Sequence, residues 1–314
     1  MNPLALLAGA AALLLARRRT RYAAQHVSRI TRITADLDRA VLFYGQALDA
    51  QLVARTTGWA VLRLAETEVA FIRPARPGRA MRRSSPSNDL WFQHIALTVA
   101  DMVSAYARLQ ATPGWRPIST SGPQLLPPEN GGVRAFKFRD PDGHPLELLW
   151  FPPTPGQTHP SPHPPIDHTA IAVASTGRSL RFYRSPGFTV AHRTHNQGPA
   201  QDRLDGLAEA RLDVTSLHPA SPGTGLELLA YRPPGRSGHT IGNTDFAADV
   251  TSIVVAPAPG VPRVIKDPDG HRLLLIAAPP HPAPSLASTP AGARPHRPPA
   301  ASAANARPEV ACPN

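Results

Sequence analysis

The sequence predicts an α+β fold built from a repeated module of one strand, one helix and about three further strands. Three segments open alike, with an alternating strand, a turn and a helix-like stretch: RITRITADLDRAVLFY from Arg29, HIALTVADMVSAYARL from His94 and HTAIAVASTGRSLRFY from His168. Strand signals ending in an apolar run follow each of them, with EVAFIRP from Glu68, ELLWFPP from Glu147 and ELLAYRPP from Glu227. The sequence DPDGH also occurs twice, from Asp140 and from Asp267. Internal repeats of this kind decide the architecture.

The chain opens with an extension, residues 1–25, that contains an apolar run from Leu4 to Ala16 followed by three arginines. The run is too short to span a bilayer as a helix, and a secretory signal would carry its positive charge before the apolar run. We therefore expect a cytoplasmic protein. A weak membrane-surface anchor and a poor signal peptide are the alternatives.

The remaining chain divides into two predicted domains. Residues 26–151 hold the first two modules, and residues 167–278 hold the third and a fourth, which opens at Val250 and closes at Leu274. The fourth is too short for a helix and all the strands, so three full modules and one truncated module are expected. The proline-rich segment 152–166 predicts a linker, and the Pro/Ala-rich segment 279–314 predicts a disordered tail.

Composition narrows the class of partner. The formal net charge is +11, but all except two of the 33 basic residues are arginines scattered along the chain. Scattered arginine is typical of a solvated surface, so we expect no nucleic-acid binding and a small-molecule partner instead. The single cysteine, Cys312, excludes a disulfide within one chain and a thiolate metal site in the predicted domains.

With these pieces in this order, the chain resembles the vicinal oxygen chelate superfamily, which includes glyoxalases, bleomycin-resistance proteins and extradiol dioxygenases. The resemblance is carried by the HIALTVADM and HTAIAVA openings, the Phe-Tyr pairs at Phe43 and Phe182, and the DPDGHPLELL hairpin. It implies βαβββ modules that pair into curved mixed-sheet cups with a metal site at the floor of a cup.

Strand alternation supports such a site from the residues themselves. His94 shares its strand face with Ala96 and Thr98, and His168 shares its face with Ala170 and Ala172. Glu147 and Glu227 each lie between two leucines, where an unpaired carboxylate is expensive unless it is protonated, paired or bound to a metal. We predict that His94, Glu147, His168 and Glu227 hold a divalent metal, which is Zn, Ni, Fe or Mn.

The other two modules lack this set, and the loss constrains the pairing. At the positions that correspond to the ligands, the first module has Arg29 in place of the histidine, and the fourth module has Val250 and Leu274. Glu68 is a doubtful candidate at the glutamate position of the first module. If modules pair in sequence order, neither cup is complete. If the second and third modules share a cup, that cup gathers all four predicted ligands. We favour the second arrangement, which requires the His94 and His168 nitrogens to lie roughly 3 to 4.5 Å apart.

The resemblance implies a substrate that chelates the metal through two adjacent oxygens. A glyoxalase-like isomerase or lyase would use Glu147 or Glu227 as the base that moves a proton between neighbouring carbons. An extradiol dioxygenase would use His94, His168 and Glu227 as ligands of iron, and Glu147 would have no ligand role. A metal-free binding protein is the third alternative. The additional glutamate favours glyoxalase-like chemistry.

Overall fold

The computed structural model describes residues 22–64, 67–81, 85–153, 166–232 and 242–278. Nearly all of the N-terminal extension, most of the predicted linker and the predicted tail lie outside these described residues. Within them, no helix is long and apolar enough to cross a membrane.

The elements follow the predicted order of strand, helix and further strands. The first module contains β1 (Ala23–Ile33), α2 (Leu37–Leu48), β2 (Gln51–Arg55), β3 (Trp59–Leu64) and β4 (Thr67–Ile72). The second contains β5 (Gln93–Thr98), α3 (Met102–Ala111), β6 (Arg116–Pro117), β7 (Gln124–Leu125), the 3-10 turn η1 (Pro128–Asn130), β8 (Arg134–Arg139) and β9 (Pro145–Trp150).

The second half repeats this order with one insertion and one truncation. The third module contains β10 (Ile166–Ala172), α4 (Thr176–Tyr183), β11 (Thr189–Gln197), the additional helix α5 (Pro199–Asp205), β12 (Arg211–His218) and β13 (Gly225–Tyr231). The fourth keeps only β14 (Val250–Ala256), β15 (Arg263–Lys266) and β16 (Arg272–Ile276). The α+β class is therefore as predicted, with mixed sheets and a last segment that has no helix.

The turn after each opening strand ends in a residue that starts the helix. Asp36, Asp101 and Ser175 are the N-caps of α2, α3 and α4, and their side-chain oxygens accept from backbone N–H groups of the first turn. Such a cap satisfies donors that a helix leaves unpaired and typically contributes about 1 kcal/mol. Each cap therefore fixes the residue at which the helix begins after the opening strand, and with it the direction in which the helix runs back over the sheet.

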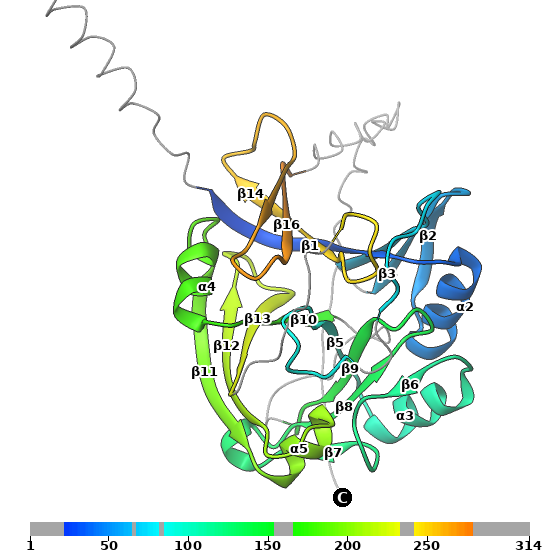
Figure 1. The fold of residues 1–314 in the computed structure, drawn as a ribbon, viewed down its shortest axis with the longest axis vertical. Helices are drawn as coiled ribbons and strands as arrows, with labels where there is room; N and C mark the ends of the chain where they lie inside the picture. The colour runs from blue at the N-terminus through cyan, green and yellow to red at the C-terminus, as the bar shows by residue number, and fades with distance from the viewer. Residues whose placement is uncertain (1–21, 65–66, 82–84, 154–165, 233–241, 279–314) are drawn as a thin grey trace, which may run out of the picture. The chain divides into compact units, whose positions relative to one another are not determined.

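The modules pair across the two halves of the chain (Figure 1). One sheet has the strand order β15-β16-β14-β1-β4-β3-β2, and the other has β11-β12-β13-β10-β5-β9-β8-β6, with β7 beside β8. The opening strands β5 and β10 are antiparallel neighbours, and so are β1 and β14. The second and third modules therefore share one sheet, and the first and fourth share the other, as the favoured arrangement requires.

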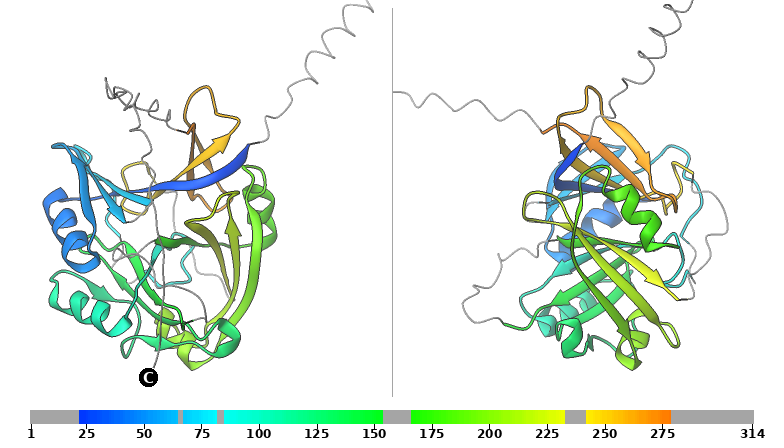
Figure 2. Two further views of the ribbon diagram at one scale, coloured as in Figure 1. Left: turned by 180° about the vertical axis from the view of Figure 1, so that it is seen from behind. Right: turned by 90° about the vertical axis from the view of Figure 1, so that its left-hand side faces the viewer.

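Strand alternation separates a packed face from a cup face in the sheet of the second and third modules. Ile95, Leu97, Leu146 and Leu148 are buried in a core with residues of α2, α3 and the other sheet. A second core lies around Leu180 and Tyr183 of α4, and Figure 2 shows this helix between strands of the two sheets. The predicted ligands lie on the opposite strand face from these cores, where the same alternation leaves room for a pocket.

The two DPDGH turns join modules that are neighbours in sequence. The Asp140 carboxylate accepts from two backbone N–H groups of its own turn and from the Tyr44 hydroxyl of the first module. Asp267 makes the same contacts within its turn and with Tyr183 of the third module. The turn is therefore an inter-module clasp, which explains why the fourth module keeps it.

The histidines of these turns correct one expectation. His144 and His271 read as exposed residues after the turn, yet their exposed fractions are 1% and 6%. Each Nε2 lies within hydrogen-bond distance of a backbone carbonyl at the end of the preceding module's opening strand, Ile33 in one case and Ala172 in the other. They complete the clasp, because a buried carbonyl needs a donor.

Removing the clasp should destabilise the fold without touching a predicted ligand. We expect Asp267→Ala to lower the free energy of unfolding by about 2 to 3 kcal/mol, because it leaves buried donors unsatisfied. Tyr183→Phe removes one hydroxyl from the same contact and should cost about 1 kcal/mol. Urea unfolding of both variants measures these values, and an Asp267→Ala variant as stable as the parent protein would contradict the clasp.

Candidate functional site

The four predicted ligands lie on four adjacent strands. His94 is on β5, Glu147 on β9, His168 on β10 and Glu227 on β13. The register sets His94, Ala170 and Glu227 in one row across the sheet and His168, Ala96 and Glu147 in the next. Because an alanine separates the two polar residues of each row, the four longer side chains have room to converge above it.

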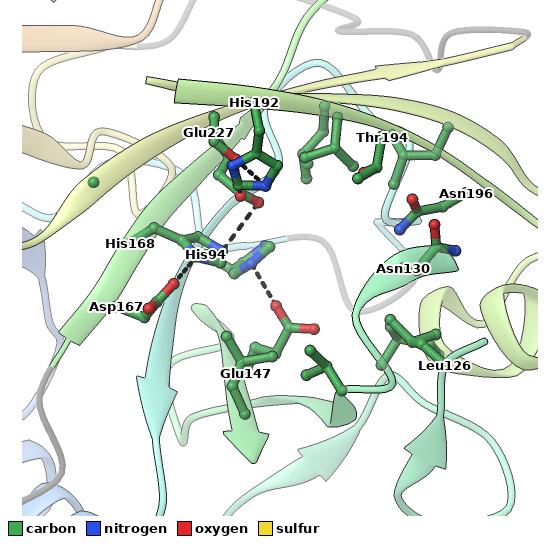
Figure 3. A pocket seen from close by; sticks show the side chains of 18 of the residues that line it. His94, Leu126, Asn130, Glu147, Asp167, His168, His192, Thr194, Asn196 and Glu227 are labelled. Atoms are coloured by element: carbon green, nitrogen blue, oxygen red, sulfur yellow. Dashed lines mark hydrogen bonds and ion pairs between the residues drawn. The ribbon is translucent and has the colours of Figure 1, made fainter. Parts of the chain in front are cut away.

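Three of the four form a tight group. Ligand atoms of His94, Glu147 and His168 all lie within 4.8 Å of one another, and all three residues are buried. His94 Nε2 lies 2.8 Å from Glu147 Oε2, and His168 Nε2 lies 3.4 Å from Glu227 Oε2 (Figure 3). The structure therefore brings all four residues together, with Glu227 at the edge of the group.

Two ring nitrogens of this group are buried without a hydrogen bond. His94 Nδ1 and His168 Nε2 have no hydrogen-bonding partner among the described residues, and His94 Nε2 contacts the Glu147 carboxylate at 2.8 Å. Buried polar atoms in native proteins are nearly always satisfied by protein, water or an ion. Histidine and carboxylate together suit zinc, nickel, iron or manganese. The residues present therefore fit a divalent metal.

Asp167 was not foreseen and supports His168 from behind. Its Oδ2 lies 2.7 Å from His168 Nδ1, so a hydrogen bond directs the other ring nitrogen into the group. A carboxylate behind a histidine is the usual outer partner of a metal-binding imidazole. The signal was available in the sequence, since Asp167 is adjacent to His168, although adjacent strand residues normally point to opposite faces.

The electrostatics of the group separate its members. Burial acts to raise the pKa of Glu147, but the charges of Lys137 and His94 outweigh it and lower that pKa to about 2. Burial lowers the pKa of His94, although Glu147 opposes the shift. Burial also acts to lower the pKa of His168, but the Glu227 charge and the Asp167 hydrogen bond raise it to about 9. In the metal-free protein at neutral pH, Glu147 is ionised, His94 is neutral and His168 is protonated.

Metal binding should therefore release about one proton at pH 7.5. A ligating histidine must be neutral, and His168, with a pKa of about 9, is the one that still carries a proton. We expect affinity to rise with pH up to about 9 and to level off above it. Calorimetric titration with Zn²⁺ in two buffers of different ionisation enthalpy counts the protons, and release of none at pH 7.5 would contradict the assignment.

Lys137 was also missed by sequence reasoning. It lies on β8 directly opposite Glu147 in the hairpin that the DPDGH turn closes. Its Nζ lies 2.6 Å from Asp205 Oδ1, and both side chains are buried. Burial acts to lower the pKa of Lys137, but Asp205 and Glu147 raise it, so the ammonium stays charged beside the site. Counting residues outward from the DPDGH turn along both strands of the hairpin would have predicted that Lys137 lies opposite Glu147.

Glu227 has a different neighbour at the equivalent place. Ser216 lies opposite it on β12, and the Ser216 hydroxyl donates to Glu227 Oε1 at 2.5 Å. The same hydroxyl lies 3.2 Å from His192 Nε2. A hydroxyl can adapt to either charge state of a carboxylate, whereas the ammonium opposite Glu147 favours only the ionised state. The two glutamates are thus equivalent by position and distinct in chemistry.

A cavity of about 330 Å³ opens from this group. Its lining includes His94, Glu147, His168 and Glu227 together with Lys137 and side chains of β11, η1 and α5. The segment HNQGPAQ, from His195 to Gln201, reads either as the cup mouth or as a plain surface loop. It does line the cavity, through Asn196 and Gln201, but it is not a plain loop, because β11 runs to Gln197 and α5 begins at Pro199.

The sheet of the first and fourth modules has no such group at the equivalent positions. Its register places Arg29, Ala70, Val250 and Leu274 where the other sheet has His94, Glu147, His168 and Glu227. Glu68, the doubtful candidate, is two residues away from the equivalent of Glu147, and its carboxylate pairs with Arg29 and Arg63. Arg29 was therefore placed correctly from the sequence, and Glu68 was not.

Residues 26–148 match the family model of the Glyoxalase/Bleomycin resistance protein/Dioxygenase superfamily. The chain thus contains a domain of this superfamily, as its sequence suggested. No curated protein matches the sequence.

Solved structures extend the likeness beyond that domain. Glyoxalase I from Zea mays is 16% identical, covers 80% of this chain and 92% of its own, and superposes with a TM-score of 0.55. A putative dioxygenase from Bacillus subtilis subsp. subtilis str. 168 is 13% identical, covers 82% of this chain and 86% of its own, and has a TM-score of 0.54. At these identities the likeness shows a shared fold.

Proposed function

We propose that this chain is a metal-dependent enzyme of the glyoxalase type, an isomerase or lyase whose substrate offers two adjacent oxygens to the metal. The observation that carries the proposal is the division of the site into a group of three ligands and one separate carboxylate. His94, Glu147 and His168 would hold the ion, and Glu227 lies at the edge of the group beside the cavity. When bound, the ion would supply positive charge to stabilise negative charge developing on the substrate oxygens.

Under this proposal the other residues position, exclude water and move a proton. Asp167 orients the His168 ring, and Lys137 keeps Glu147 ionised. Glu227 takes a proton from a substrate carbon and returns it to the neighbouring carbon, while Ser216 keeps its carboxylate in place through Oε1. The apolar side chains of the cavity wall limit access of water to the carbon that has lost its proton.

A second candidate is a ring-cleaving dioxygenase. Two histidines and one carboxylate are the ligand set of many non-haem iron oxygenases, and the group of three has this composition. From the sequence, Glu227 is expected to be the carboxylate ligand of such an enzyme, and Glu147 has no role in it. The tight group in the structure contains Glu147 instead, so this alternative gives Glu227 no role.

Metal loading followed by two assays separates these functions from a metal-free binding role. The purified protein is loaded with Zn, Ni, Mn or Fe(II), its metal content is measured, and it is tested with hemithioacetals and with catechols. We expect one ion per chain and turnover of a hemithioacetal with Zn or Ni. Turnover of catechols that requires Fe(II) and oxygen would favour the dioxygenase, and a chain that retains no ion would favour the binding role.

A further inference from the structure

We propose that Asn196 presents a fixed hydrogen-bond acceptor at the far end of the cavity, which selects substrates that carry a hydroxyl or N–H group there. This inference rests on the proposed function only for the identity of the group that binds at the end of the cavity near His94 and His168. Asn196 lies on β11, four residues beyond His192, whose ring is next to Ser216 and hence to Glu227. Four residues of a strand span about 13 Å, so the acceptor lies well away from the metal ligands (Figure 3).

The orientation of the Asn196 amide is fixed by a buried chain of hydrogen bonds. Asp205 is a carboxylate and only accepts: Lys137 donates to its Oδ1 at 2.6 Å, and Gln201 Nε2 donates to its Oδ2 at 2.7 Å. Gln201 must therefore turn its Oε1 toward Asn196, and Asn196 Nδ2 donates to it at 3.2 Å. An amide can usually be reversed without consequence, but reversal here would set two carbonyl oxygens against each other.

This chain of bonds leaves one oxygen without a partner. Asn196 lines the cavity with an exposed fraction of 8%, and its Oδ1 has no hydrogen-bonding partner among the described residues. A buried acceptor in this state costs free energy that a donor on a bound molecule recovers. Lys137, Asp205 and Gln201 fix the orientation of this amide.

The rest of the lining defines the class of substrate. Much of the wall between the two ends is apolar, with Leu126, Leu149, Leu212, Val214 and Leu229. Lys137 is the one lysine or arginine among the described lining residues, and its charge is matched by Asp205. The cavity therefore suits a compact molecule with two adjacent oxygens, an apolar middle and a neutral donor. A carboxylate at the far end would face the Asn196 oxygen and is disfavoured.

Binding of matched probes tests the selection. On the Zn-loaded protein, calorimetry compares benzohydroxamate, whose two oxygens chelate metal, with derivatives that carry a hydroxyl, a methoxy or a carboxylate group at the meta or para position or on a one-carbon arm. We expect the best hydroxyl derivative to bind about five- to tenfold more tightly than its methoxy counterpart, the gain of one hydrogen bond. The carboxylates should bind more weakly than both.

Three variants identify the acceptor. Asn196→Leu keeps the branched shape of the side chain and should abolish the preference for the hydroxyl. Gln201→Met frees the Asn196 amide to turn, so the preference should fall while the methoxy derivative gains. Thr194→Val removes another polar group from the same wall and should leave the preference unchanged. A preference that survives Asn196→Leu, or one that Thr194→Val removes, overturns the proposal.

A second comparison does not depend on chelation. Phenol and anisole are compared by ligand-observed NMR on the same parent and Asn196→Leu proteins. Phenol should bind more tightly than anisole only when Asn196 is present, and equal binding to the parent protein overturns the proposal. If benzohydroxamate itself fails to bind while phenol is selected, the chelating site and the proposed function fail, and the Asn196 acceptor stands.

Discussion

Under the proposed function, replacing Glu227 by glutamine should slow turnover by orders of magnitude while leaving metal binding intact. Glu227 lies outside the tight group of three, so its loss leaves the proposed ligands His94, Glu147 and His168 in place. A glutamine fills the same space but cannot take a proton, and a general base contributes about 10² to 10⁴ in rate. We expect kcat to fall by about that factor with one ion still bound per chain, measured by metal analysis and steady-state kinetics.

Glu147→Gln is the matched control and should give the opposite result. Glu147 is an ionised member of the group of three, with a pKa of about 2, and a neutral amide is a poorer ligand. Loss of an outer partner costs 10- to 100-fold in metal affinity, so loss of a charged ligand should cost at least about that much. Variants that lose metal to the same extent would show that Glu227 is a fourth ligand and would remove the basis for assigning it as the base.

The difference between these glutamates shows what a sequence pattern carries and what it omits. His94 and His168 stood out because each opens an alternating strand, and Glu147 and Glu227 because each lies between leucines. Those facts are local, and the structure does bring all four residues together. Their inequality depends on cross-strand neighbours, Lys137 for one and Ser216 for the other. Neighbours of that kind follow from register, and a shift of one residue would reverse every side chain.

The pairing of modules could be favoured from the sequence for a related reason. The absence of ligands at Arg29, Val250 and Leu274 has a simple explanation only if the first and fourth modules share a sheet, and the strand order has that form. Glu68 was misplaced because it opens an apolar run, as Glu147 does, whereas its position on β4 is two residues earlier. A repeat fixes the order of elements more firmly than it fixes the alignment of residues within them.

Contacts between distant segments were beyond the sequence. Asp205 belongs to α5, an insertion in the third module, and it meets Lys137 of the second module in the interior. Nothing local marks either residue as a partner of the other. The same holds for the clasp between Asp267 and Tyr183, since the tyrosine reads as an ordinary apolar-face residue of its helix. Both contacts satisfy buried polar groups, a condition that becomes visible only when burial is known.

Breaking the Lys137–Asp205 pair should destabilise the protein more than breaking the clasp at Asp267. Both side chains of the pair are almost fully buried, so Lys137→Met leaves the Asp205 carboxylate in the interior with the Gln201 amide and the Tyr231 hydroxyl beside it and no cation among the described residues. Removing one partner of a buried pair typically costs about 3 to 5 kcal/mol, because the other charge stays uncompensated. Urea unfolding of the metal-free protein should show a loss of this size.

A double-mutant cycle gives the control. Asp205→Asn removes the charge and keeps an oxygen for Gln201, so Lys137→Met combined with Asp205→Asn should be less destabilised than the two single losses added together. Additive losses would mean that the pair is not coupled. Because the Lys137 charge helps to lower the pKa of Glu147, Lys137→Met should also raise that pKa from about 2 and weaken metal binding most at acid pH. One buried lysine thus links the stability of the cup to the ionisation of a predicted metal ligand.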